Sequence, residues 1–253
     1  MRIDTVSIFP EMFSALQSGV VGRAIQAQLL QLQNWNPRDY SEDAHATVDD
    51  RPYGGGPGMV MMAKPLCAAI RDAKAQQQGS YKTIYMNPQG RRLNQQTINR
   101  LAQYDGLILL AGRYEGVDER LIELEIDEEW SIGDYVISGG ELAIMVLIDA
   151  LARQHDGVLG EQESAKQDSF MHGLLDCPHY TRPADFEGLQ VPEVLLSGNH
   201  QAIEHWRLEQ SLIRTLRRRP DLFKQYILND QEQAIIDDYL AKQDNHPENE
   251  ARK

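Results

Sequence analysis

The chain has 253 residues, of which 42% are hydrophobic and 25% are charged, so it can bury a full core and does not have the composition of a disordered protein. Its formal net charge of −13 argues against nucleic-acid binding by overall charge, although a local basic patch still provides phosphate contacts. Its only cysteines, Cys67 and Cys177, lie far apart in no metal or redox spacing, which disfavours a disulfide scaffold and fits a reducing compartment.

The N-terminal residues do not resemble a signal peptide, and no apolar run approaches the roughly 20 residues needed to span a bilayer. We therefore expect a soluble, cytoplasmic protein with no membrane partner.

The first part of the chain alternates between strand-like and helix-like segments. The predicted strands are Arg2–Ile8, Thr83–Met86 and Leu107–Ala111. The predicted helices are Pro10–Leu16, Lys64–Gln77, Leu93–Gln103 and Glu141–Ala152. This alternation predicts an α/β domain with a mostly parallel sheet.

The pattern changes after Arg153, where residues 160–173 are polar and small and predict a flexible linker. Helices are expected at His200–Arg219 and Gln231–Gln243. We predict a domain at residues 1–159, a linker at 160–173, an α-helical domain at 174–246 and a frayed tail at 247–253.

Glycines at positions 112, 116, 133, 139 and 140 follow the predicted strand Leu107–Ala111. Ligands of α/β proteins bind beyond the carboxyl ends of the strands, so a site is expected here. The spacing fits neither G-x-G-x-x-G nor the P-loop. Asn87–Arg92 follows another strand; alone it predicts a turn, but paired with the glycines at 112 and 116 it indicates a shared pocket.

Residues 51–59 contain four glycines and two prolines. A ligand-contacting loop and a flexible surface connection explain this composition equally well.

Charged residues gather at two further places. The acidic run at Glu125 and 127–129 favours a solvated face over a metal site, and the seven histidines show no ligand spacing, so we assign no metal ligand. A basic stretch at residues 207–224 has a local charge of 6 − 2 = +4. On a helix, Arg207, Arg214 and Arg218 share a stripe with Arg217 beside it, which is either a phosphate-facing surface or a solvated face.

Several long motifs, together covering essentially the whole chain, resemble one family: the bacterial tRNA (guanine-N1)-methyltransferases of the TrmD family and SPOUT class, which modify guanine at tRNA position 37. The motifs are Ser7–Phe13, Val48–Met59, Asn87–Leu93, Ala111–Arg120, Glu125–Leu142, Leu174–Pro183 and Val191–His200.

The resemblance implies a knotted α/β domain that binds S-adenosylmethionine through a deep trefoil knot, a helical domain, and a homodimer with shared active sites. It implies that the methyl donor is surrounded by Met86, Pro88, Gly90, Gly112, Arg113, Tyr114, Glu115, Ile132, Gly133, Asp134, Tyr135, Val136, Ile137, Gly139, Gly140 and Leu142.

The resemblance also implies that Asp168 is the general base and that Arg153 stabilises charge developing on guanine O6. From the residues alone, Asp168 would be a solvated linker charge and Arg153 a helix-terminal cation. The implied partner is tRNA rather than DNA, and magnesium is expected without an assigned ligand. The expected tRNA contacts are Asp49, Tyr53, Gly54, Gly55 and Gly58 with Arg207, Arg214, Arg217 and Arg218.

Two other interpretations stay open at this point. The chain could be a non-catalytic RNA-binding protein that keeps the fold, or a related knotted RNA methyltransferase with a different target atom, such as a ribose hydroxyl.

Overall fold

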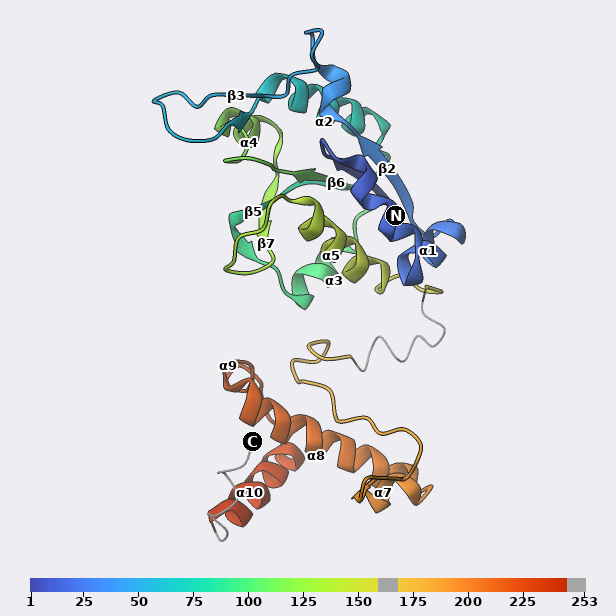
Figure 1. Cartoon of the computed structure of the whole chain (residues 1–253). Helices are drawn as coiled ribbons and strands as arrows, with labels where there is room; N and C mark the ends of the chain where they lie inside the picture. Colours follow the sequence, from blue (N-terminus) through green and yellow to red (C-terminus); the bar gives the residue numbers. More distant parts are fainter. Residues whose placement is uncertain (159–167, 245–253) are drawn as a thin grey trace. The chain divides into compact units, whose positions relative to one another are not determined.

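The computed structural model describes residues 1–158 and 168–244, and the chain divides into two compact units, Met1–Gln162 and Glu163–Lys253 (Figure 1). Residues 159–167, which include most of the predicted linker, and the predicted tail at 247–253 lie outside the described residues.

A five-stranded sheet forms the centre of the first unit, with strand order β2-β1-β6-β5-β7. Every pairing in this sheet is parallel, which confirms the α/β prediction. The strands are β1 (Arg2–Val6), β2 (Gln31–Trp35), β5 (Tyr81–Arg92), β6 (Gly106–Ala111) and β7 (Glu128–Ser131). All residues of the central strand β6 are buried, as a continuous apolar run in a parallel sheet covered on both faces requires.

Helices cover both faces of the sheet (Figure 1). Leu107 and Leu109 of β6 face the α3 and α5 side, whereas Ile108 and Leu110 face the α2 and α4 side. This alternation gives the unit two apolar cores, one on each side of the sheet. The helices are η1 (Pro10–Gln17), α1 (Gly19–Gln26), η2 (Pro37–Tyr40), α2 (Ala63–Gln76), α3 (Gln95–Leu101), α4 (Glu119–Glu125) and α5 (Glu141–Ala152).

Strand β5 continues to Arg92, beyond the predicted end at Met86, because its pairing with β7 resumes after an irregularity. Met86 and Arg91 both pair with Trp130, so residues 87–90 bulge out of the ladder. The bulge projects the chain outward at the carboxyl end of the sheet.

The predicted solvated face holds for Asp127, which is exposed, but is wrong for Glu125. Glu125 is only 7% exposed, and its carboxylate accepts hydrogen bonds from Arg71 Nε at 2.6 Å and Lys74 Nζ at 2.8 Å. Burial alone raises the pKa of the Glu125 carboxyl, but the bonds and charges of Lys74 and Arg71 outweigh burial and lower it. Glu128 pairs similarly with Arg100, so distant cations hold this run in the fold.

The second unit contains helices α7 (Glu193–Leu196), α8 (His200–Arg218), α9 (Pro220–Phe223) and α10 (Asp230–Asp244), and a small hairpin of β8 (Asp185–Phe186) and β9 (Leu189–Gln190). Asn199 caps α8, since its side chain accepts from the Ala202 N–H at 3.2 Å. Leu212 of α8 and Ile236 of α10 are buried in this unit.

Within the described ranges, none of the helices has both the length and the apolar character that crossing a bilayer requires.

We expect Leu109→Ala to lower the free energy of unfolding of the first unit by about 2–5 kcal/mol, because Leu109 is fully buried in the central strand. Denaturant titration followed by circular dichroism measures the change. Leu124→Ala is the control, since Leu124 is 65% exposed on α4. Equal destabilisation by both variants would contradict the assigned core.

Candidate functional site

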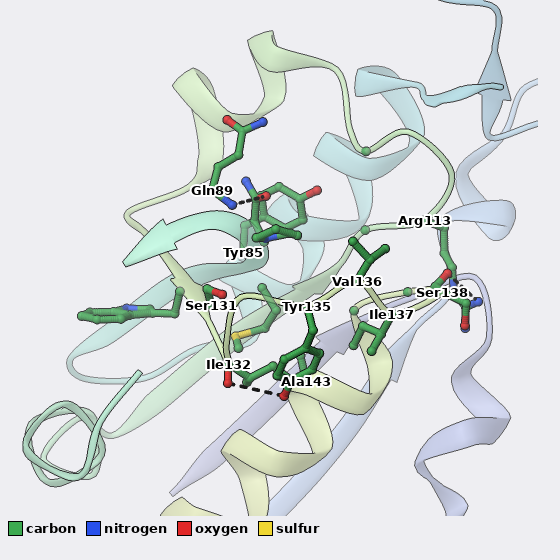
Figure 2. Close-up of a pocket in the computed structure, with 18 of the residues that line it drawn as sticks. Tyr85, Gln89, Arg113, Ser131, Ile132, Tyr135, Val136, Ile137, Ser138 and Ala143 are labelled. Atoms are coloured by element: carbon green, nitrogen blue, oxygen red, sulfur yellow. Dashed lines mark hydrogen bonds between the residues drawn. The ribbon is translucent and has the colours of Figure 1, made fainter. Parts of the chain in front are cut away.

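A cavity of about 240 Å³ lies where β5, β6 and β7 end (Figure 2). Three segments form it: the bulge of β5, the loop that follows β6, and the loop between β7 and α5. The lining residues are 85–89, 112–116, 130–133, 135–140 and Ala143. Its position at the carboxyl edge of adjacent parallel strands is the usual location of ligand sites in α/β domains.

Two of these loops touch through their backbones at Gly140. The Gly140 N–H donates to the Gly112 carbonyl at 2.9 Å, and a Cβ on Gly140 would lie 2.8 Å from the Cα of Ala111. No side chain fits at that separation, which explains why the helix start at this point is glycine.

The loop at residues 112–116 is also fixed from outside the cavity. Glu115 N–H donates to the Met59 carbonyl, and Met61 N–H donates to the Gly116 carbonyl, each at 2.9 Å. The Glu115 carboxylate lies against Gly58, where a Cβ would come within 2.4 Å of Oε1. The glycine-rich segment at 51–59 therefore joins the same cluster of loops.

The loop at residues 132–140 places apolar side chains at the cavity. Tyr135 N–H donates to the Gly133 carbonyl at 3.0 Å, and its hydroxyl donates to the Ile132 carbonyl at 3.4 Å. Figure 2 shows Ile132, Tyr135, Val136 and Ile137 gathered along one side. Val136 is 91% exposed, so its side chain stays free to contact a bound molecule.

Tyr85, just before the bulge of β5, and Trp130, near the end of β7, line the cavity and were missed by the sequence analysis. Burial, with the nearby Glu129 charge, raises the pKa of Tyr85 to about 12, so its hydroxyl stays protonated at neutral pH. Arg91 lies with its Cζ 4.7 Å from the Trp130 ring centroid. Each aromatic residue lies two positions before a loop, at 87–90 or 132–140, and that position was the available signal.

Most of the residues expected around the methyl donor line this cavity, but Gly90, Asp134 and Leu142 are outside the lining formed by the described residues. Gly90 packs on the Trp130 backbone, Asp134 pairs with Arg92, and Leu142 is 47% exposed on α5. Asn87, Gln89 and Gly116 also line the cavity, as the shared pocket predicted from the two strand-end loops requires, and Ser131, Ser138 and Ala143 are further lining residues that were not predicted. Donor binding by the lining residues stays a prediction.

The two predicted catalytic residues belong to different units. Arg153 caps the carboxyl end of α5, and its N–H donates to the Asp149 carbonyl at 3.3 Å. Asp168 belongs to the second unit, where its carbonyl accepts from the Met171 N–H at 3.3 Å. Their joint role stays a prediction.

The predicted tRNA contacts also divide between the units. In the first, Asp49 lies in β3 (Asp49–Asp50), which pairs with β4 (Val60–Met61), and Tyr53 in the connecting loop is 99% exposed. In the second, Arg207, Arg217 and Arg218 are exposed on α8 and Arg214 is half-buried. Within residues 168–244, none of these four arginines forms an ion pair at 4.0 Å or less.

Asp176, Cys177 and His179 form a cluster whose donor atoms lie within 4.8 Å of one another. The His179 ring already bonds to the Asp176 carboxylate at 2.8 Å, and burial raises the pKa of the Cys177 thiol. Magnesium prefers an octahedron of oxygen ligands, so this set does not fit it.

Comparison with known proteins identifies a family. The profile of the family described as tRNA (Guanine-1)-methyltransferase TrmD matches residues 1–225. A protein of Shewanella sediminis is 58% identical over 241 residues, 95% of this chain and 100% of the relative. One of Shewanella woodyi is 59% identical over 241 residues, 95% of this chain and 97% of the relative. Both carry the name tRNA (guanine-N(1)-)-methyltransferase.

Gly140→Ala should lower the affinity for S-adenosylmethionine by about tenfold or more, because the added methyl group forces apart two of the three segments that form the cavity. Isothermal titration calorimetry measures the affinity. Gly157→Ala is the control: it adds a methyl to a left-handed backbone position outside the cavity lining. Unchanged affinity in Gly140→Ala would show that the loop contact does not shape the donor site.

Proposed function

We infer that this chain, which belongs to the tRNA (guanine-1)-methyltransferase TrmD family, transfers a methyl group from S-adenosylmethionine to N1 of guanine at tRNA position 37. The observation that carries the proposal is the cavity at the ends of β5, β6 and β7, built from three loops of which two touch through their backbones.

The cavity residues fit a nucleoside-containing donor. Gly140 has no side chain and lets the backbones of residues 112–116 and 132–140 approach each other. Their N–H and C=O groups can therefore hydrogen-bond to a bound donor molecule. Ile132, Ile137 and Tyr85 add an apolar and aromatic lining. When bound, S-adenosylmethionine would supply an electrophilic methyl group on a sulfonium.

The chain's own residues would handle the proton and the charge. Guanine N1 carries a proton at neutral pH, so a base must remove it as the new N–C bond forms and the S–C bond breaks. We assign this proton to the Asp168 carboxylate. Arg153 would stabilise the negative charge that develops on guanine O6.

We further propose the family's deep trefoil knot and a homodimer with shared sites. The tight passage of residue 140 against residues 111 and 112 supports the knot, since such contact is needed where one segment threads past another. The homodimer with shared sites is proposed from membership of the family alone.

Binding of the anticodon arm is assigned to residues 49–58 and to the arginines of α8. A cluster of cations without ion-pair partners among residues 168–244 is available for phosphate contacts in a chain of net charge −13. Because no cluster among the described residues fits magnesium, no step is assigned to that ion.

Incubation with methyl-labelled S-adenosylmethionine and tRNA, followed by nucleoside analysis, tests the proposal. We expect label in 1-methylguanosine, and none in a transcript with adenine at position 37. Label on a ribose would favour a related methyltransferase with a different target atom. Absence of transfer despite tRNA binding would favour a non-catalytic RNA-binding protein.

Asp168→Asn should reduce turnover by about 10²–10⁴-fold, because the amide cannot accept the N1 proton. Single-turnover methyl transfer at saturating donor and tRNA measures this step. S-adenosylmethionine affinity should stay near the wild-type value, which controls for misfolding. Turnover close to wild type would remove Asp168 from the mechanism.

Arg214→Glu should weaken tRNA binding and reduce the slope of log Kd against log salt by about one, since one phosphate contact is lost. Filter binding across a salt series measures both quantities. Lys242→Glu is the matched control, because Lys242 lies on α10 and pairs with Asp238. Equal effects of the two variants would show that the α8 arginines affect tRNA binding only through the net charge of the protein.

A further inference from the structure

The carboxylate of Glu141, in the first turn of α5, is fully buried. Ser7 Oγ donates to its Oε1 at 2.6 Å, and Arg113 Nε donates to its Oε2 at 2.9 Å. Ser7 belongs to the motif at residues 7–13, which has no role in the proposed reaction. These contacts join the N-terminal segment, the loop after β6 and the start of α5.

Burial of Glu141 is not explained by stability alone. An acidic residue in the first turn of a helix is already favourable while it is exposed to solvent. Burying the Glu141 carboxylate therefore adds a desolvation cost that this helix position does not require. Replacing a buried ion pair with apolar residues is often neutral or stabilising. A role in positioning other groups accounts for a buried pair of this kind.

Arg113 is held on several sides, and its side chain is only 15% exposed. Besides Glu141, Nη1 donates to the Ser138 carbonyl at 3.1 Å, and Nη2 contacts Met12 Sδ at 3.2 Å. The guanidinium carbon lies 4.6 Å from the Phe9 ring centroid. Figure 2 shows Arg113 beside Ser138 at one end of the cavity.

The guanidinium links the two loops that line the cavity. It crosses residue 139, where a Cβ would lie 2.1 Å from Arg113 Nε. Its bond to the Ser138 carbonyl and the backbone bond from Gly140 to Gly112 join the same two loops. The separation of the loops therefore depends on where the Arg113 side chain is held.

We propose that Glu141 and Ser7 are positioning residues for the methyl-donor site. Acting through Arg113, they hold residues 112–116 and 138–140 at the separation that the donor requires, without touching the donor themselves. This inference rests on the proposed function, since it takes the cavity as the S-adenosylmethionine site.

Glu141→Gln tests the proposal, because it keeps the side-chain size but leaves the buried Arg113 cation without its counter-charge. Kd and KM for S-adenosylmethionine should rise about tenfold or more. Because the donor that does bind reaches the same chemistry, kcat at saturating donor should stay within about threefold and KM for tRNA should not change. Ser7→Ala should raise the donor Kd by a smaller factor, since the ion pair between Glu141 and Arg113 remains in this variant.

Glu125→Gln is the matched control. Glu125 is a buried carboxylate paired with Arg71 and Lys74 in the same unit, outside the cavity lining. It should lower the unfolding midpoint without raising donor Kd. A purely structural role for Glu141 predicts that the two variants behave alike.

Wild-type donor Kd in Glu141→Gln, or an equal rise in Glu125→Gln, would overturn the inference. If Glu141→Gln does not fold, Ser7→Ala decides: a raised donor Kd supports the proposal, and an unchanged one overturns it. Failure of the wild-type chain to bind S-adenosylmethionine would instead overturn the proposed function.

Discussion

The close approach of two loops at the carboxyl edge of the sheet is the constraint on which the candidate site depends. The Gly140 N–H bonds to the Gly112 carbonyl, and the neighbouring Arg113 is fixed by the fully buried Glu141. The backbone contact at Gly140 sets the distance between the two loops, and the ion pair with Glu141 fixes the position of the Arg113 side chain that links them. Together they form the cavity from segments distant in sequence.

The sheet supplies the rigid base for these loops. Parallel strands bring their carboxyl ends to one edge, and the fully buried β6 anchors that edge between two apolar cores. The bulge of β5 and the aromatic residues Tyr85 and Trp130 then complete the wall. Loops alone would not hold such a cavity in shape.

Local patterns in the sequence predicted the α/β class, α5 and the position of the cavity, because apolar periodicity and glycine-bearing strand ends are local signals. Strand β2 was missed because it is a largely exposed edge strand with the sequence QLQNW. Glu125 and Glu128 of the acidic run were misjudged because their partners Arg71 and Arg100 come from distant helices. Roles for Asp168 and Arg153 came from the family resemblance, since their local sequence carries no such signal.

Hydrogen exchange with and without S-adenosylmethionine tests most directly whether the three loops are the donor site. We expect the donor to slow amide exchange in residues 85–89, 112–116 and 130–140 of the full chain, because the cavity is lined from these segments. Protection confined to other segments, with exchange in these three unchanged at saturating donor, would contradict it.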